Sequence, residues 1–298
     1  MPYQGELAAI LAALSWTVSS LFVERRGKAY SPWSLNALTK LGGLLTVSLL
    51  AWLMMGQFFP RAGAMQWGML LLSGFLGFSL GDGFLYAAFQ ALGAKRTLLI
   101  FSANPVLTGL FGWIFLGEAL MPLHLVGILL AVAGIMWVIR ADMGGQGSPE
   151  QTGPTITWQG LLFAILATLG QAAGALLSKA AMASLEAIPA SQIRLIGGVL
   201  GSAVLLSLTG QWKTLPAPLK EGRGRGILAV SVLLGTLVGM VLSMLAIKLT
   251  QVAVASILMS LMPVMILPIE HFVLKERVRP REVMGALLTL LGVGMLFA

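Results

Sequence analysis

Long apolar stretches alternate with short polar connections along the whole chain. Most stretches approach the length of about 20 residues that an α-helix needs to cross a bilayer. Backbone inside a bilayer must satisfy its own hydrogen bonds, which favours helices. The pattern predicts an all-α integral membrane protein with ten transmembrane helices, at residues 4–22, 32–56, 66–92, 97–116, 122–139, 158–182, 190–208, 226–248, 252–274 and 281–297.

The second half of the chain repeats the first. A shift of 158 positions, which carries Gly77 onto Gly235, aligns residues 70–134 with 228–292 without a gap. The coincident residues include Gly81 with Gly239, Pro105 with Pro263, Glu118 with Glu276, Gly127 with Gly285, and Gly134 with Gly292. A long internal period of this kind indicates a duplicated structural unit.

The repeat also predicts the domain organisation. Residues 1–141 form the first five-helix unit and residues 158–298 the second, while residues 142–157, rich in Gly, Ser and Pro, form a linker. Five is an odd number, so the second unit must enter the membrane in the opposite orientation. Inverted repeats are typical of secondary transporters, whose substrate site lies near the midplane where the repeats meet.

Composition and charge support a membrane protein. The chain is 57% hydrophobic and 10% charged, whereas soluble domains are about 25% charged. The net charge is +8, but the basic residues lie mostly between the apolar stretches, so a nucleic-acid partner is not expected. The bilayer is the expected surroundings, and a bacterial inner (plasma) membrane the expected location. The chain has no cysteine, which excludes disulfides.

The basic residues indicate an orientation. Three lie on the side that holds the predicted 2–3, 4–5, 6–7 and 8–9 connections: Arg61, Lys179 and Lys248. Fourteen lie on the opposite side: Arg25, Arg26, Lys28, Lys95, Arg96, Arg140, Lys213, Lys220, Arg223, Arg225, Lys275, Arg277, Arg279 and Arg281. Cytoplasmic loops carry the excess of Lys and Arg. Both termini are therefore predicted to lie outside.

Asp82 is the most informative polar residue, because it lies near the middle of a predicted helix. A charge at that depth costs about 2.5–3.5 kcal/mol and faces a cavity or a partner. We consider two roles: a substrate ligand or proton carrier, or a structural partner for Lys40. The repeat counterpart of Asp82 is Met240, so the carboxylate breaks the symmetry of the repeats.

Several other residues are candidates for the pathway or for the scaffold. The pathway candidates are Trp16, Tyr86, Trp113, Asn104 and Gln171. The alternative role for a tryptophan is an interface anchor. The alternative role for Asn104 is to bond the backbone where Pro105 breaks the helix. Glu270 and His271 form either a gate or proton relay, or an interfacial pair near the headgroups. Structural or hinge roles are predicted for Gly77, Gly81, Gly235, Gly239, Pro105, Pro263, Pro268, Glu118, Glu276, Lys40 and Arg194. For Lys40 and Arg194, binding of an anionic substrate is the alternative.

Enzymatic chemistry finds little support. The stretch 77–81, Gly-Phe-Ser-Leu-Gly, matches the elbow of serine hydrolases, and His124 and His271 exist. That elbow requires a strand–turn–helix context, whereas this stretch lies inside a predicted helix, and in the repeat Ser79 becomes Leu237. Walker, zinc-ligand and dinucleotide motifs are absent. We therefore expect no catalytic residue, cofactor or metal.

The sequence resembles EamA-type members of the drug/metabolite transporter superfamily. The resemblance is carried by Phe115-Leu116-Gly117-Glu118 and Leu274-Lys275-Glu276 with the glycines that follow each, by Asn104-Pro105 and Met262-Pro263, and by the basic residues on the second helix of each repeat. It implies ten helices, a central cavity lined by helices 1, 3, 4, 6, 8 and 9, and export or exchange of small metabolites. It also implies that both termini lie inside; we follow the charges, which indicate outside.

The expected function is secondary transport of a small metabolite or drug-like molecule by alternating access, with protons as a candidate coupling partner. The alternative is a passive channel or a lipid-handling protein on the same scaffold. An intramembrane serine hydrolase is the least favoured function.

Overall fold

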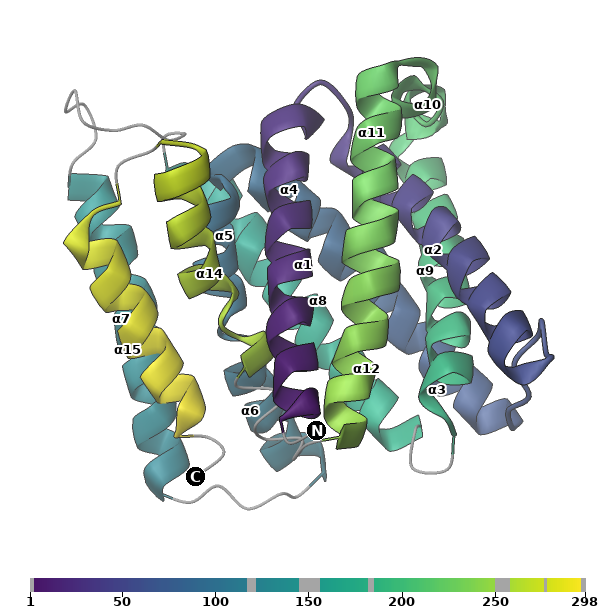
Figure 1. The fold of residues 1–298 in the computed structure, drawn as a ribbon, viewed down its shortest axis with the longest axis horizontal. Coiled ribbons are helices and arrows are strands. Elements are labelled where there is room, and N and C mark those ends of the chain that lie inside the picture. The colour runs from purple at the N-terminus through teal and green to yellow at the C-terminus, as the bar shows by residue number, and fades with distance from the viewer. Residues whose placement is uncertain are drawn as a thin grey trace.

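The protein is a bundle of helices in a computed structural model (Figure 1). The structure describes residues 3–116, 122–144, 156–181, 185–249, 258–275 and 278–295, in which all regular structure is helical. Within these ranges, seven helical spans are long and apolar enough to cross a membrane, and Pro122–Val138 and Met262–Val273 are shorter apolar helices. The predicted all-α membrane fold is confirmed.

The helices follow the predicted order. The first half contains α1 (Gln4–Gly27), α2 (Pro32–Met55), α3 (Ala64–Ser73), η1 (Gly74–Gly81), α4 (Asp82–Leu92), α5 (Ala94–Phe101), α6 (Asn104–Leu116) and α7 (Pro122–Gly144). The second half contains α8 (Trp158–Ala181), α9 (Ala187–Thr209), η3 (Gln211–Thr214), α10 (Ala217–Lys220), α11 (Gly222–Val230), η4 (Ser231–Val238), α12 (Gly239–Leu249), α14 (Met262–Pro268), η5 (Ile269–Val273) and α15 (Pro280–Gly294).

The third and eighth spans change to a π-helix at matching positions. The segment η1 joins α3 to α4, and η4 joins α11 to α12. The 158-residue shift carries Gly81, the last residue of η1, onto Gly239, the first residue after η4. Short π segments are rare and are frequent at functional sites. Their recurrence in both repeats shows that the interruption belongs to the duplicated unit.

Prolines interrupt the fourth and ninth spans. Proline lacks a backbone donor and clashes with the preceding turn. The fourth span accordingly breaks at residues 102–103, just before Asn104-Pro105. In the ninth span α14 begins at Met262-Pro263, and Pro268 is its last residue before η5. The hinge roles of these prolines remain predictions.

The helices α7 and α15 show that the halves are inverted, and they lie side by side at the left edge of Figure 1. A Cβ on Gly134 would lie 2.7 Å from the carbonyl oxygen of Gly285, and one on Gly292 would lie 2.4 Å from that of Gly127. The shift of 158 exchanges these two contacts. Between them, Thr289 Oγ1 lies 3.5 Å from the carbonyl oxygen of its own counterpart, Ala131. The two helices therefore run antiparallel about a pseudo-two-fold axis that crosses them.

The same relation holds in the rest of the bundle. Trp16 of α1 packs on Gly239. Gln171 of α8 packs on Gly81, which is the repeat counterpart of Gly239. The first helix of each half thus covers the third helix of the other half. Each repeat completes the core of its partner, so neither half buries its own apolar surface alone.

Two connections differ from the prediction. The helix α7 continues to Gly144, inside the segment predicted as a linker, and residues 145–155 lie outside the described part. The polar segment 211–225, predicted as a loop, contains η3, α10 and the start of α11.

Helix α1 begins and α15 ends on the same side of the bundle (Figure 1).

Candidate functional site

A buried ion pair lies at the end of η1. Asp82 begins α4 and is 9% exposed; Lys40 of α2 is 7% exposed. The Lys40 ammonium donates to Asp82 Oδ2, and Gln171 Nε2 of α8 donates to Asp82 Oδ1. Both carboxylate oxygens therefore have donors, and the donors come from both repeats. Hydrogen bonds to a carboxylate are the stronger kind, so the two donors fix the position of the Asp82 side chain.

Arg194 of α9 extends the cluster to a fourth helix. Its guanidinium carbon lies 4.3 Å from the centroid of the Phe78 ring, and Lys40 Nζ lies 5.0 Å from the same centroid. Cations within about 6 Å of an aromatic face are attracted to it. Arg194 Nε is buried and has no hydrogen-bond partner among the described residues. We call Lys40, Phe78, Asp82, Gln171 and Arg194 the central cluster.

A glycine sets the approach of α9 to η1. A Cβ on Gly74 would lie 1.9 Å from the carbonyl oxygen of Arg194. Only a residue without a side chain fits at that distance. The backbone contact brings Arg194 to Phe78 and is independent of the arginine side chain.

Trp16 corresponds to a member of the central cluster through the repeat, and Tyr86 lies beside the cluster. Trp16 is the repeat counterpart of Gln171, by a shift of 155 that also carries Gly5 onto Gly160. Its Nε1 donates to the carbonyl oxygen of Gly235 in η4 at 2.8 Å, which satisfies a carbonyl of the π segment. Tyr86 is buried, and its hydroxyl lies 3.4 Å from Oγ1 of Thr39, the neighbour of Lys40.

The structure does not join the remaining pathway candidates to the central cluster. Asn104 Oδ1 accepts a hydrogen bond from Thr108 Oγ1 at 3.2 Å within α6. Trp113 is 51% exposed on the surface of α6, as a lipid-facing or interfacial anchor would be. Glu118 and Glu276 lie outside the described residues.

The described contacts of Glu270 and His271 involve different residues. Glu270 in η5 is 4% exposed, and its Oε2 lies 2.7 Å from Lys95 Nζ of α5. Lys95 also lies 3.3 Å from both carboxylate oxygens of Glu282 in α15. His271 is exposed, with its ring 4.8 Å from that of Phe272. We call Lys95, Glu270 and Glu282 the ionic triad.

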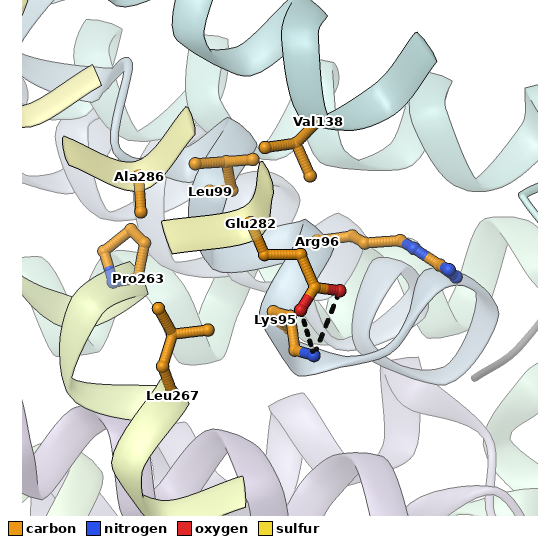
Figure 2. A pocket seen from close by; sticks show the side chains of 8 residues that line it. All are labelled: Lys95, Arg96, Leu99, Val138, Pro263, Leu267, Glu282 and Ala286. Carbon is orange, nitrogen blue, oxygen red and sulfur yellow. Dashed lines mark hydrogen bonds and ion pairs between the residues drawn. The ribbon is translucent and has the colours of Figure 1, made fainter. Parts of the chain in front are cut away.

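The ionic triad borders a small pocket between the ends of four helices. Figure 2 shows Lys95 and Glu282 facing one another beside it. Its space of about 240 Å³ includes open solvent and is lined by Lys95, Arg96, Leu99, Val138, Pro263, Leu267, Glu282 and Ala286. Sequence reasoning missed Lys95 and Glu282, because both lie at helix starts and resembled ordinary loop charges.

Four glycines with predicted structural or hinge roles lie at close helix contacts, and their hinge roles remain predictions. Ideal Cβ atoms on Gly77 and Gly81 would lie 3.4 and 3.2 Å from atoms of Gln171, and one on Gly239 would lie 2.3 Å from Trp16 Nε1. A Cβ on Gly235 would lie 3.0 Å from Ser19 Oγ. These glycines let α1 and α8 approach the π segments closely.

Outside the membrane spans, polar bonds join the start of α2 to the 211–221 connection. The hydroxyl of Tyr30 donates to Glu221 Oε2 at 2.6 Å, and Ser31 Oγ donates to Gln211 Oε1 at 2.6 Å. The hydrogen bond to Glu221 raises the pKa of Tyr30 above its ordinary value, and burial adds to the shift. These bonds link the two repeats on the side opposite the termini.

The serine-hydrolase elbow lacks its required context. Ser79 lies inside η1, within the continuous helical span Ala64–Leu92. The strand and sharp turn that expose a serine nucleophile are absent from this span.

The described fold and the central cluster define an integral membrane protein of two inverted helical repeats with ionisable residues between them. The chain belongs to the EamA-like transporter family, which matches residues 3–140 and 158–298. Family membership agrees with a transporter rather than an enzyme.

Two relatives extend the comparison. The "Uncharacterized transporter YvbV" of Bacillus subtilis (strain 168) is 27% identical over 209 residues; the match covers 68% of this chain and 60% of the relative, less than two thirds of its length. A solved structure described as "Crystal structure of protein" is 20% identical with a TM-score of 0.69, covering 99% of this chain and 96% of that one. The latter likeness concerns the fold alone.

Proposed function

We propose that the protein is a secondary transporter that moves a small metabolite or drug-like molecule by alternating access, as an exporter or exchanger. The observation that carries this proposal is the central cluster, in which α2 and α4 of one repeat meet α8 and α9 of the other. Ionisable residues inside membrane helices are costly and mark substrate or ion pathways. Inverted repeats place such a site at their interface.

The helix interruptions supply the moving parts in this proposal. Three π segments, η1, η4 and η5, and two proline breaks lie in the third, fourth, eighth and ninth spans. A break in the backbone hydrogen-bond ladder lets the parts of a helix tilt independently. The repeats then rock about the central cluster, exposing it to one side at a time.

Asp82 acts here as a positioning residue. Its charge is balanced by Lys40, and its second oxygen is occupied by Gln171. Because both carboxylate oxygens accept hydrogen bonds from protein side chains, these contacts support the structural role of Asp82. We propose that Asp82 holds Lys40 and Gln171 in place at the repeat interface.

The orientation remains part of the proposal. The excess of basic residues places the connections between α1 and α2 and between α9 and α11 in the cytoplasm, with both termini outside. The bacterial inner (plasma) membrane is the proposed location.

Counterflow in proteoliposomes tests the function. Liposomes loaded with a candidate metabolite should take up labelled metabolite from outside at equal concentrations on both sides, and an unrelated internal solute should not support this uptake. Candidates come from a thermal-shift screen, because a ligand that binds only the folded state raises apparent stability by mass action. Flux that shows no stimulation by internal substrate would indicate a passive channel instead.

A further inference from the structure

We propose that the central cluster binds a small molecule through an oxyanion, a carboxylate or a phosphate group, and that Arg194 is the residue that holds it. This inference rests on the proposed transport function and names the substrate class of the same site.

The central cluster carries an uncompensated positive charge. Lys40 and Arg194 supply two positive charges against the one negative charge of Asp82. Asp82 is already occupied by Lys40 and Gln171. Arg194 stacks on the face of Phe78 and also experiences the charge of Asp82, but both oxygens of that carboxylate already accept hydrogen bonds from Lys40 and Gln171. A charge inside a membrane protein is stable when it is paired, so the site is complete only with an anion.

The geometry of Arg194 suits such an anion. The guanidinium presents several donors in a planar fork that matches a carboxylate or a phosphate. No described acceptor receives a hydrogen bond from Nε, and the residue is partly exposed. An arginine that only joined helices would direct its donors to protein acceptors, because leaving buried donors unpaired is costly.

The backbone approach of α9 to η1 does not depend on the side chain of Arg194. The approach of α9 to η1 depends on the carbonyl oxygen of Arg194 and the missing side chain of Gly74. Substituting the guanidinium leaves that backbone contact intact. A variant at Arg194 is therefore suitable for separating ligand binding from folding.

Thermal shift of the purified protein provides the test. The probes are acetate, succinate and phenylacetate, each compared with its amide, and inorganic phosphate; chloride keeps the ionic strength equal. The proteins are wild type, Arg194→Gln, Arg194→Lys, and Arg61→Gln as a control on an exposed residue of the connection before α3.

We expect one or more oxyanions to stabilise the wild type and Arg61→Gln, while the matching amides do not. Arg194→Gln should weaken the apparent affinity about tenfold or more, since hydrogen bonds to charged groups are the strong ones. Arg194→Lys should fall between them because it keeps the charge but loses the fork. Stabilisation by phosphate alone identifies a phosphate group, and stabilisation by carboxylates identifies a carboxylate.

The inference is wrong if no oxyanion stabilises the wild type more than chloride does, or if Arg194→Gln responds like the wild type. Counterflow separates this failure from failure of the proposed function. Counterflow of a neutral or cationic solute that survives Arg194→Gln would leave transport standing and overturn the oxyanion site. Oxyanion binding without counterflow of the bound probe would leave the site standing and contradict transport.

Discussion

At the residue scale, the ion pair of Asp82 with Lys40 has a direct consequence for stability. Asp82→Asn keeps the shape of the side chain and leaves the Lys40 ammonium buried without its partner charge. Breaking a buried pair in this way costs about 3–5 kcal/mol. We expect a lower melting temperature in detergent, and Asp82→Asn combined with Lys40→Met should recover part of the loss.

The opposite outcome would assign Asp82 another role. A stable Asp82→Asn protein that transports normally but without pH dependence would show that the carboxylate carries a proton. A stable protein with normal transport and normal pH dependence would remove Asp82 from the mechanism.

Sequence reasoning singled out Lys40, Asp82, Gln171 and Arg194 but not Phe78, and it did not predict how these residues are arranged. It considered Lys40 as a partner for Asp82, and that contact is present. It treated Lys40 and Arg194 as equivalent residues. Gly43 packs on Thr236 and Gly198 on Phe78, which are equivalent contacts, so Arg194 matches Thr39 rather than Lys40. Thr39 and Lys40 are adjacent, and one position along a helix turns the direction of a side chain by about 100°. Which of the two positions is equivalent to Arg194 is therefore visible only in three dimensions.

At the element scale, the contact between α7 and α15 predicts paired mutational effects. A Cβ added at Gly134 or Gly292 would lie within 2.7 Å of backbone atoms of the other helix. Such overpacking costs about 1–3 kcal/mol. Gly134→Ala and Gly292→Ala should lower the melting temperature by similar amounts. Gly109→Ala in α6, where no atom lies within 4 Å, should not; an equal loss there would contradict this explanation.

The ionic triad predicts a second effect at this scale. Lys95→Met removes the ammonium that bridges the carboxylates of Glu270 and Glu282, whose side chains are 6% and 10% exposed. We expect a loss of about 3 kcal/mol of unfolding free energy. Lys213→Met, on an exposed residue of η3, serves as the control, and equal thermal stabilities of the two variants would refute the role of the triad.

Tyr30 gives a prediction for alkaline pH. Its pKa is raised in the folded protein chiefly by the hydrogen bond to Glu221. The bond therefore stabilises the fold fully below the unfolded pKa of 10.0, and the stabilisation is lost as the pH rises through the higher folded value. Thermal unfolding of the wild type and Tyr30→Phe from about pH 8 to 11 should show a difference that disappears toward the alkaline end. A difference independent of pH would contradict this role.

Of the helix interruptions, the proline breaks could be predicted from the sequence, whereas the π segments could not. Pro105 and Pro263 predicted breaks because proline changes backbone hydrogen bonding directly, and breaks lie beside both residues. Nothing in the composition of η1 or η4 predicts a π-helix, since the extra residue per turn is stabilised by packing with another helix. Ser15 Oγ and Trp16 Nε1 bond carbonyls of η4, and these partners lie 219 positions away in sequence.

At the scale of the whole molecule, the charge distribution predicts the orientation. The chain has no cysteine, so single cysteines introduced at Gln57 and Lys213, both exposed, report on opposite sides. An impermeant thiol reagent applied to intact cells should label Gln57→Cys, and should label Lys213→Cys only after the cells are opened. The reverse pattern would place both termini in the cytoplasm.

The overall architecture was the most predictable part of the molecule. The 158-residue repeat and an odd number of helices per unit predicted an inverted pair, and Gly134, Gly285, Gly127 and Gly292 display that relation in α7 and α15. Loop structure was less predictable. The short elements at 211–220 depend on contacts such as Ser34 with Thr214, whose hydroxyl oxygens lie 2.8 Å apart, and such contacts leave no periodic pattern.

The axis that relates α7 to α15 bears on how net movement across a membrane can arise. A scaffold that coincides with itself when turned over offers the same framework to both faces of the bilayer, so the framework alone favours neither direction. In the proposed transporter, the net flux of substrate then follows its concentration gradient. Only residues that lack an equivalent in the other repeat make the two faces of the protein different. Asp82 is such a residue, because its repeat counterpart is Met240. Lys95 and Glu282 of the ionic triad are two more, since their counterparts are Ala253 and His124. The triad joins the ends of α5, η5 and α15 on one face, so in the proposed alternating-access cycle we expect the two faces to require different energies to open.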